Sequence, residues 1–286
     1  MANLKDIRNR IGTVQSIQQV TKAMKLVAAA KLRRSQTNME QARPYAQGIN
    51  GVLKNLLPSL EREIHPLLKV PQVHKKLGLV VITADRGLCG SFNANILKTA
   101  HKTVDAYGKD NVSLICFGKK GRDYFKRREY NVVESHVDFW NALGFDSGVQ
   151  FARSVATRYL SGEFDEVKII YNNFKNVAQQ EIVVWPYLPL VLDEGDEKDT
   201  SEYLFEPDKE VVVQSLVPRH LNVQMWRFLL ESNAAEQAAR MMAMENATDN
   251  AGELISDLQL EYNKARQTAI TNEILEIVGG AEALVE

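Results

Sequence analysis

The stretch EQAARMMAMENATDNAGELISDLQLEYNKARQTAITNEILEIVGG, residues 236–280, decides the fold of this chain of 286 residues. No proline follows Pro218, and Gly252 is the only glycine between Gly195 and Gly279, so one helix is expected over about 219–278. At a rise of 1.5 Å per residue such a helix is about 90 Å long. Two rows of residues each recur every seven positions: Met241, Thr248, Ile255, Tyr262 and Ala269, and then Met244, Ala251, Leu258 and Ala265. This repeat predicts a left-handed coiled coil whose seam is rich in Ala and Thr.

The first segment, up to about Leu57, supplies a partner for that helix. Its apolar residues lie three or four positions apart, as in a helix, at Ile7, Ile11, Val14, Ile17, Val20, Met24 and Val27. Pro44 can kink or end this helix. Residues 1–45 contain nine Lys or Arg and two Asp or Glu, whereas residues 219–286 contain five and eleven. The opposite charges predict that the two ends attract each other and that the helices pair antiparallel.

The middle of the chain has a different pattern, in which short apolar runs alternate with helical stretches. The runs are 77–82, 112–117, 167–171 and 182–185, and the helical stretches are near 92–107, 119–128 and 146–161. This alternation predicts βαβ units and a Rossmann-like α/β domain. The acidic stretch 193–202 has the composition of a solvated loop.

These patterns predict three parts: an N-terminal shaft helix at 1–57, a central α/β domain at 75–210 and a C-terminal shaft helix at 211–286. A domain of about 135 residues has a radius of gyration near 14 Å. Helices of about 80–90 Å cannot lie within that radius, so we expect them to project from the domain as a shaft. A long helix lying on one unusually large domain is the alternative.

Composition limits the function classes. The formal net charge is −1, and no apolar run approaches the roughly 20 residues that span a bilayer. Cys89 and Cys116 are too few for a disulfide framework, and the five histidines show no metal-ligand spacing. A reducing, cytoplasmic compartment without a targeting segment is expected. Binding of nucleic acid by the basic N-terminal end is a rival interpretation, but no aromatic residue precedes Tyr45.

The stretch TADRGLCGSFN, residues 83–93, has the layout of a catalytic loop, because it connects an apolar run with helix-forming sequence. A phosphate loop of the Walker type needs Gly-x-x-x-x-Gly-Lys-Ser/Thr, and here Gly87 and Gly90 are too close together. The Gly-x-Ser-x-Gly pattern of a nucleophile elbow is missing as well. We therefore expect a structural turn, with Asp85 and Arg86 pairing with their surroundings or with a neighbouring subunit.

Three blocks of the sequence resemble a known family. They are LKDIRNRIGTVQSIQQVTKAMKLVAAAKLRR at 4–34, ITADRGLCGSFN at 82–93, and residues 236–284. The last block ends in Ile270-Thr271-x-Glu273-x-x-Glu276-x-x-x-Gly280-Ala281, which looks like the full signature of the family. Over essentially its whole length the chain resembles the γ subunit, the central shaft, of bacterial F-type ATP synthases.

The resemblance implies a rotor without an active site or cofactor of its own. In this family the two terminal helices lie in the central hole of a ring of α and β subunits, and the α/β domain contacts the ε subunit and the membrane-embedded c ring. Proton flow turns the c ring and the shaft, and ATP is made or hydrolysed on the α/β ring. The implied location is peripheral, on the cytoplasmic face of the cell membrane, with one copy per complex. The chain has no room for the insertion that carries a redox-active dithiol in the chloroplast forms, so thiol control is not expected.

The resemblance also implies contact residues. Lys264, Arg266 and Gln267 are expected to grip a β subunit, because Arg holds a carboxylate bidentately and Gln both donates and accepts. Apolar bearing contacts are expected at Ile270, Ile274 and Ile277. A foot that binds ε and the c ring is expected at Tyr203, Phe205 and Glu206, with Lys31 and Arg33 as basic candidates nearby.

Two other classes of protein stay open. A coiled-coil adaptor would explain the helices but would leave the α/β domain without a role. An enzyme built on Cys89 would need a histidine base, for which His101 and His136 are available. Nothing in the sequence places either histidine beside the cysteine.

Overall fold

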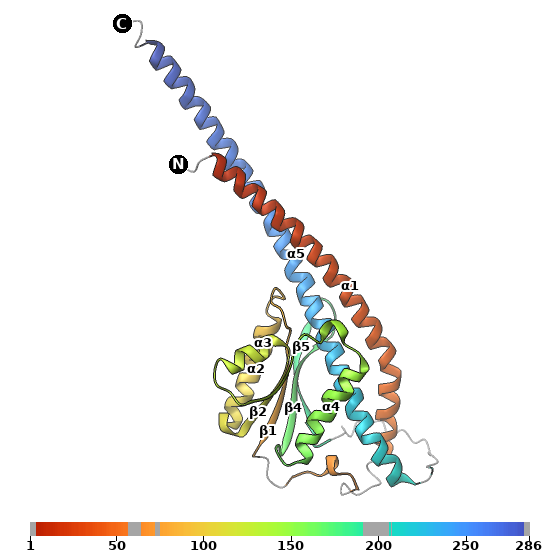
Figure 1. Cartoon of the computed structure of the whole chain (residues 1–286). Helices are drawn as coiled ribbons and strands as arrows, with labels where there is room; N and C mark the ends of the chain where they lie inside the picture. Colours follow the sequence, from red (N-terminus) through yellow and green to blue (C-terminus); the bar gives the residue numbers. More distant parts are fainter. Residues whose placement is uncertain (1–3, 57–63, 72–74, 191–205, 207, 283–286) are drawn as a thin grey trace. The chain divides into compact units, whose positions relative to one another are not determined.

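A computed structural model describes residues 4–56, 64–71, 75–190, 206 and 208–282 (Figure 1). The chain forms two compact units, of which unit 1 comprises 1–27 and 241–286 and unit 2 comprises 28–240. Two long helices, α1 (Leu4–Leu56) and α5 (Lys209–Glu282), contribute residues to both units. The division between the units therefore lies inside both helices. The expected domain boundaries near 57, 75 and 210 stay predictions.

Unit 2 is built on a five-stranded sheet (Figure 1). Its strands are β1 (Leu77–Ile82), β2 (Val112–Phe117), β3 (Val132–His136), β4 (Glu166–Phe174) and β5 (Gln180–Leu188), in the spatial order β3-β2-β1-β4-β5. The first four are parallel, and β5 pairs antiparallel with β4. Leu77 of β1 lies between Val112 of β2 and Glu166 of β4. Every residue of β1 is buried, as a central parallel strand with both faces covered requires.

The two faces of the sheet carry separate cores. The alternate residues Leu77, Leu79 and Val81 of β1 pack in one core with α2 (Phe92–Tyr107) and α3 (Lys119–Lys126). Val80 and Ile82 belong to the other core, which includes α4 (Phe145–Leu160) and the parts of α1 and α5 in unit 2. Short 3₁₀ turns complete unit 2: η3 (Pro66–Leu68), η4 (Lys109–Asn111) and η5 (Trp140–Ala142).

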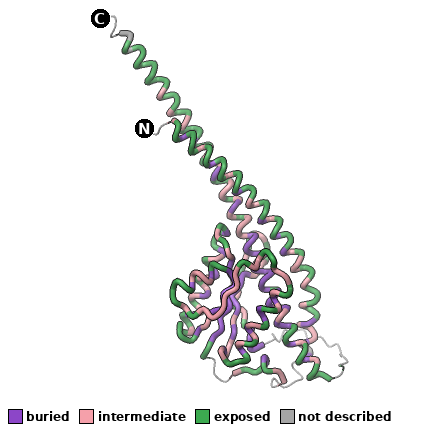
Figure 2. Tube along the Cα trace, viewed as in Figure 1, coloured by how far each residue is buried: buried purple, intermediate pink, exposed green. Residues whose placement is uncertain are grey.

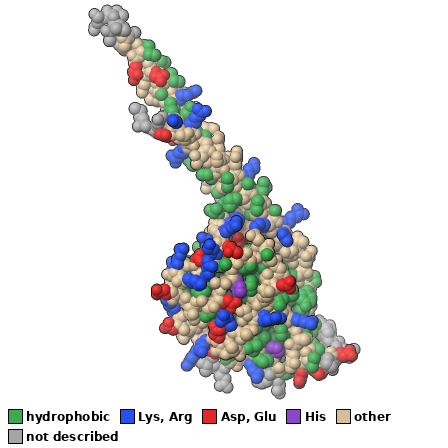
Figure 3. Space-filling model, in the orientation of Figure 1, with side chains coloured by type: hydrophobic (Ala, Val, Ile, Leu, Met, Phe, Trp, Pro, Cys, Tyr) green, Lys and Arg blue, Asp and Glu red, His purple; other side chains and the backbone are tan. Residues whose placement is uncertain are grey.

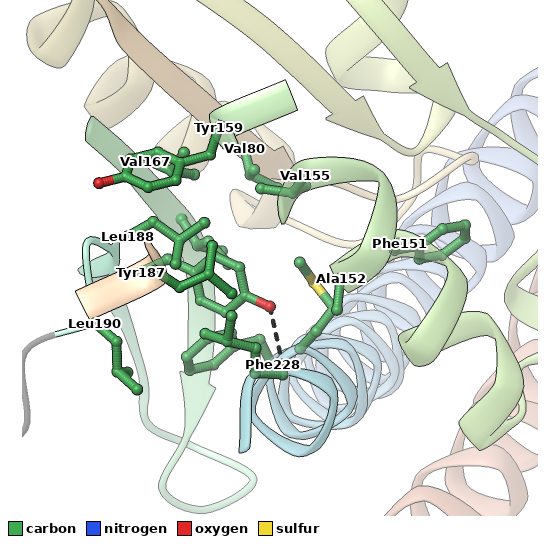
Figure 4. Close-up of a cluster of buried hydrophobic side chains, with 14 of the residues drawn as sticks. Val80, Phe151, Ala152, Val155, Tyr159, Val167, Tyr187, Leu188, Leu190 and Phe228 are labelled. Carbon is green, nitrogen blue, oxygen red and sulfur yellow. Dashed lines mark hydrogen bonds between the residues drawn. The ribbon is translucent and has the colours of Figure 1, made fainter. Parts of the chain in front are cut away.

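The second core attaches α5 to the sheet (Figure 4). Phe228 of α5 is fully buried, and its ring centroid lies 4.5 Å from that of Tyr171. Tyr187 of β5 donates a hydrogen bond from its hydroxyl to the carbonyl oxygen of Leu221, at 3.0 Å. The aromatic residues supply large apolar area, and the tyrosine hydroxyl still has a partner inside the core.

Unit 1 is an antiparallel pair formed by the first residues of α1 and the last part of α5. Ile7 and Val14 of α1 are buried in one cluster with Ala251 and Leu258 of α5. All nine positions of the predicted seam on α5 are buried or half-buried, and they alternate with exposed residues (Figure 2). The seam on α5 is confirmed, and so is the predicted fold class.

The apolar stripe predicted on α1 is wrong in its second half. Ile17, Val20 and Val27 are 50%, 59% and 57% exposed, whereas Thr21 is only 9% exposed. The inward positions 7, 14 and 21 repeat every seven residues, so the true seam includes small or polar residues. A prediction based on hydrophobicity alone chooses the larger apolar side chains next to this seam instead of the small or polar ones within it.

Two proline positions and one strand also differ from expectation. The helix α5 begins ten residues before the expected position 219 and contains Pro218 in its interior. Proline is unfavourable there, but Val213, Val217 and Leu221 on the same helix are buried in unit 2 and stabilise its first turns. Pro44 likewise lies inside α1 and does not end it. The apolar runs of the sequence do not predict the strand β3, because its residues VVESH are all half-buried and two of them are charged or titratable.

Candidate partner-binding surfaces and the loop after the first strand

The loop from Thr83 to Ser91 joins β1 to α2 at the carboxyl edge of the sheet. Asn93, in the first turn of α2, closes the loop from inside. Its Oδ1 accepts a hydrogen bond from the backbone N–H of Ala84 at 2.9 Å, and its Nδ2 donates to the carbonyl oxygen of Arg86 at 3.3 Å. The loop is therefore tied to the helix that follows it.

Asp85 connects this loop to those that follow the two neighbouring strands. One carboxylate oxygen accepts from the backbone N–H of Lys119 at 2.7 Å, and the other accepts from that of Asp138 at 2.9 Å. The loops after β2 and β3 are thus held by the side chain that follows β1. The prediction that Asp85 pairs with its surroundings is confirmed, whereas the side chain of Arg86 is exposed.

The end of β1 and the loop after β2 lie so close together that position 118 must be a glycine. Gly118 has φ +101°, and a Cβ built there would lie 2.0 Å from the carbonyl oxygen of Thr83. The hydroxyl of Thr83 accepts a hydrogen bond from the backbone N–H of Gly121 at 2.9 Å. At the carboxyl edge of the sheet, the backbone of Gly118 and Gly121 therefore packs against Thr83 and occupies the space between β1 and β2.

Cys89 has the surroundings of a core residue. It is 2% exposed, and burial raises the pKa of its thiol although the charge of Arg240 lowers it. The two candidate bases are engaged elsewhere: His101 lies 2.9 Å from the hydroxyl of Tyr130, and His136 lies 2.6 Å from Glu134 Oε1. A high thiol pKa and distant histidines do not make an activated nucleophile.

Arg240, on the part of α5 in unit 2, contacts this loop and pairs with Glu236, and sequence analysis did not find either residue. Arg240 donates from Nη1 to the carbonyl oxygen of Gly87 at 2.5 Å and from Nη2 to Glu236 Oε1 at 2.6 Å. The side chains of the ion pair are only 11% and 8% exposed. Burial raises the pKa of Glu236, and Arg240 opposes that rise. The pair lies four residues apart on one helix, a spacing that gives no signal about the distant loop.

A second carboxylate with several partners, half-buried, lies on β3. Glu134 accepts hydrogen bonds from Ser154 Oγ at 2.7 and 2.8 Å and from Arg158 Nε at 2.9 Å, in addition to its contact with His136. These partners, with His136 the strongest, lower the pKa of Glu134 to about 2. The network fixes α4 against the edge strand of the sheet.

The candidate grip and bearing residues lie in the C-terminal part of α5, in unit 1. Lys264, Arg266 and Gln267 are exposed, and their side chains have no hydrogen-bond partner within the described residues. Ile270, Ile274 and Ile277 are 47%, 54% and 71% exposed. Hydrophobic side chains are visible on the outer surface of this helical pair (Figure 3). Exposed apolar residues at helical spacing are typical of a surface that a partner covers.

The candidate foot residues are not brought together. Tyr203 and Phe205 lie outside the described residues, and Glu206 is exposed just before α5. Lys31 of α1 donates to Asn141 Oδ1 at 3.1 Å, and Ser35, four residues on, bonds Asn233. Asn233 is 24 residues into α5, about 36 Å along the helix from its start. The expectation that Lys31 and Arg33 lie near Glu206 is therefore wrong.

Two chemical features are absent from the described ranges. No group of three or more His, Cys, Asp or Glu side chains there could hold a metal ion. None of the helices in those ranges has both the length and the apolar character needed to cross a membrane.

Two long paired helices with outward apolar residues, together with an α/β unit, define a stalk subunit that functions inside an assembly. The family model described as ATP synthase matches residues 3–284. The ATP synthase gamma chain of Chloroherpeton thalassium is 46% identical over 300 residues, and that of Chlorobaculum parvum is 48% identical over 290, each covering 99% of both chains.

Solved structures agree. A chain of the central stalk and c-ring of Tetrahymena thermophila mitochondrial ATP synthase is 27% identical, with a TM-score of 0.62 over 80% of this chain and 99% of that one. A chain of the Euglena gracilis mitochondrial enzyme has a TM-score of 0.73 over 98% and 94%, and at 24% identity this shows the fold alone. The chain belongs to the ATP synthase gamma chain family.

Proposed function

We propose that this chain transmits torque between a membrane-embedded c ring and a ring of catalytic α and β subunits, without an active site of its own. Proton flow would then drive synthesis of ATP on the ring, and hydrolysis would drive the reverse rotation. The observation that carries this proposal is the structure of α5 in unit 1. Its inward positions up to Ala269 are buried or half-buried in a seam with α1, whereas Ile270, Ile274 and Ile277 lie beyond that seam, in a stretch that is exposed throughout, and are about half exposed or more. Such residues need a partner to cover them.

The proposed grip on the ring consists of Lys264, Arg266 and Gln267. They lie beside the half-buried seam residues Ala265 and Ala269, and their own side chains are exposed. These side chains can therefore donate hydrogen bonds to a partner. Arg266 would hold a carboxylate of one β subunit bidentately, and Gln267 would add one donor and one acceptor. Ile270, Ile274 and Ile277 would slide against the apolar inner surface of the ring.

The proposed foot consists of Tyr203, Phe205 and Glu206 and would bind the ε subunit and the c ring. The basic candidates Lys31 and Arg33 are left out of this foot, because Lys31 contacts Asn141 of η5 in another part of unit 2. One copy of the chain would serve each complex. The complex would hold it peripherally on the cytoplasmic face of the cell membrane.

Coexpression tests the proposal directly. The chain should copurify with the α and β subunits of the same organism as a stable complex with three copies of each and a single copy of this chain. The isolated chain should hydrolyse no ATP, whereas the complex should. Copurification without single-copy stoichiometry, or turnover by the chain alone, would contradict the proposed role.

The foot has its own test. Replacing Tyr203 and Glu206 together with Ala should weaken proton-coupled synthesis in membranes more than hydrolysis by the soluble head. Equal loss of both activities would show that these residues act elsewhere. The Lys102→Gln variant, at an exposed position of α2 distant in sequence from the foot, is the control for a nonspecific surface change.

A further inference from the structure

The switch point of the sheet in unit 2 lies between β1 and β4. From β1 the chain continues outward to β2 and β3, and it then returns to the other side of β1 as β4. Open α/β sheets bind ligands at this point, beyond the carboxyl ends of the strands. On the β2 side the edge is closed by Asp85 and by the contact of Gly118 with Thr83. On the β4 side there is a cavity of about 380 Å³.

Asn172, one of the residues that line this cavity, carries a buried donor without a partner in the described part of the chain. Asn172 of β4 is 4% exposed, and its Nδ2 has no hydrogen-bond partner among the described residues. Buried polar groups in folded proteins are nearly always paired, so an unpaired amide donor indicates a missing acceptor. An oxygen atom of a ligand in the cavity would supply that acceptor.

The N-terminus of α2 forms another wall. This helix of 16 residues begins after Ser91, and the side chain of Ser91 does not cap it. Ser91 Oγ accepts from Asn95 Nδ2 at 3.1 Å, which leaves the hydroxyl hydrogen available to a ligand. The first backbone N–H groups and the dipole of the helix favour an anion at this position.

Among the described residues that line the cavity, Lys175 and Glu181 are charged. They form an ion pair of 2.7 Å, and their side chains are 46% and 52% exposed. An ion pair this exposed contributes little stability, so Lys175 is free to turn toward a bound anion. The walls therefore offer an amide, a hydroxyl, a helix N-terminus and an ammonium group, and all of these can donate to one ligand.

We propose that this cavity binds a phosphoryl group, either as inorganic phosphate or as the terminal phosphate of a nucleotide. A phosphate oxyanion has enough acceptor oxygens for Asn172, Ser91, Lys175 and the first turn of α2 together. This site is independent of the proposed contacts with the ring and the foot, because none of those residues lines it.

Nuclear magnetic resonance on the full chain labelled with ¹⁵N tests the site. Inorganic phosphate and ADP are titrated separately at constant ionic strength, with sodium chloride as the reference. Saturable shifts are expected for the amides of residues 91–95 and for the side-chain amide of Asn172. Tighter binding of ADP would identify a nucleotide as the source, and equal binding would identify the phosphoryl group alone. Shifts that chloride reproduces, or no shifts at all, would overturn the proposal.

Variants locate the binding. Lys175→Gln should weaken phosphate binding about tenfold, the effect of about 1.4 kcal/mol in affinity. Asn172→Asp should abolish it, because it replaces a donor by a negative charge of the same shape. Lys102→Gln removes an exposed charge from the same helix α2, outside the cavity, and should change nothing. Equal weakening by Lys102→Gln and Lys175→Gln would show a diffuse charge effect. If Asn172→Asp does not fold, the comparison of Lys175→Gln with Lys102→Gln, both at exposed positions, decides whether the cavity binds phosphate.

Discussion

Arg240 on α5 reaches the carbonyl oxygen of Gly87, 153 residues earlier in the chain, with a hydrogen bond of 2.5 Å from Nη1. The same guanidinium neutralises Glu236, one turn away on the helix. One side chain thus joins the first connection of the sheet to the last helix of unit 2. Because both charges are buried, the contact stabilises the fold only while both partners are present.

Arg240→Ala should therefore destabilise unit 2. Removing one partner of a buried ion pair typically costs about 3–5 kcal/mol. Adding Glu236→Gln should recover part of that loss, because it removes the uncompensated charge. Urea unfolding of the isolated chain gives the free energies, and Lys175→Gln, in an exposed ion pair, should cost about 0–1 kcal/mol. Similar costs for Arg240→Ala and Lys175→Gln would contradict the structural role of Arg240.

Acid should weaken the fold through Glu134. Its pKa is about 2 in the folded chain against an ordinary value of 4.5, so the unfolded state binds the proton more tightly. The stabilisation is fully present above about pH 5 and is lost as the pH falls toward 2. Glu134→Gln should lower the free energy of unfolding at pH 7 by about 1.5–3 kcal/mol and should flatten its dependence on pH below 5.

Urea midpoints measured between pH 2.5 and 7 check this prediction. Glu40→Gln, at an exposed position of α1, is the matched control and should keep the pH dependence of the parent chain. An unchanged slope in Glu134→Gln would mean that other groups account for the acid sensitivity.

The seam of unit 1 should resist larger side chains. Thr21 is 9% exposed and faces α5, whereas its neighbour Val20 is 59% exposed. Thr21→Leu overfills the seam and should destabilise the helical pair by about 1–3 kcal/mol. Val20→Leu should leave the isolated chain unchanged. Hydrogen exchange of residues 4–27 measures the effect, and equally fast exchange in the two variants would show that Thr21 does not lie in the seam.

Cys89 should be chemically inert in the folded chain. Its thiol is buried and burial raises its pKa, and Cys116 is fully buried with a pKa of about 12. Alkylation by iodoacetamide at pH 8 should be slow until the chain is unfolded in denaturant. Cys89→Ser should leave hydrolysis by a reconstituted complex close to the parent rate. Loss of hydrolysis in an intact complex would show that the loop takes part in the chemistry.

The proposed grip predicts a kinetic change without loss of assembly. Arg266→Ala combined with Gln267→Ala should lower steady-state synthesis and hydrolysis of ATP severalfold. Truncating one partner of a desolvated charged pair costs about 2–5 kcal/mol, but a contact that must release at every step has an intermediate effect. Bearing residues Ile270, Ile274 and Ile277 remain in this variant and should hold the complex together. Parent turnover in a complex shown to contain the variant would refute the grip.

Much of the fold follows from the sequence because the central strands are buried on both faces. The runs at 77–82 and 112–117 match β1 and β2 residue by residue. The strand β3 lies at the sheet edge, where Glu134 and His136 are half-buried and paired with each other, so its apolar content is low. Strand prediction from apolar runs fails where ionic contacts replace apolar ones.

The sites were less accessible to sequence analysis. The exposure of Arg266 follows from its position off the seven-residue repeat, which local spacing determines, whereas Ile274 lies in the stretch 270–278, where every residue is exposed. The contact between Arg240 and Gly87 depends on tertiary packing between residues far apart in the chain, and a single sequence carries no signal of it. The same holds for the unpaired amide of Asn172, which exists only because β4 packs beside the start of α2.

The hydroxyl groups of Thr21 and Thr248 lie 2.8 Å apart across unit 1, and Lys25 pairs with Glu245 one turn further along at 2.6 Å. These polar contacts define how the two helices are aligned lengthwise. Sliding one helix by a single heptad would place Thr21 opposite Met241 or Ile255, neither of which has a hydroxyl group to replace that of Thr248. The rest of the seam would tolerate such a slip, because the seam positions one heptad to either side on α5 (Met241, Met244, Ile255 and Leu258) are apolar as well. The threonine pair therefore specifies the register of the two helices, much as a single buried polar residue specifies the register of a coiled coil.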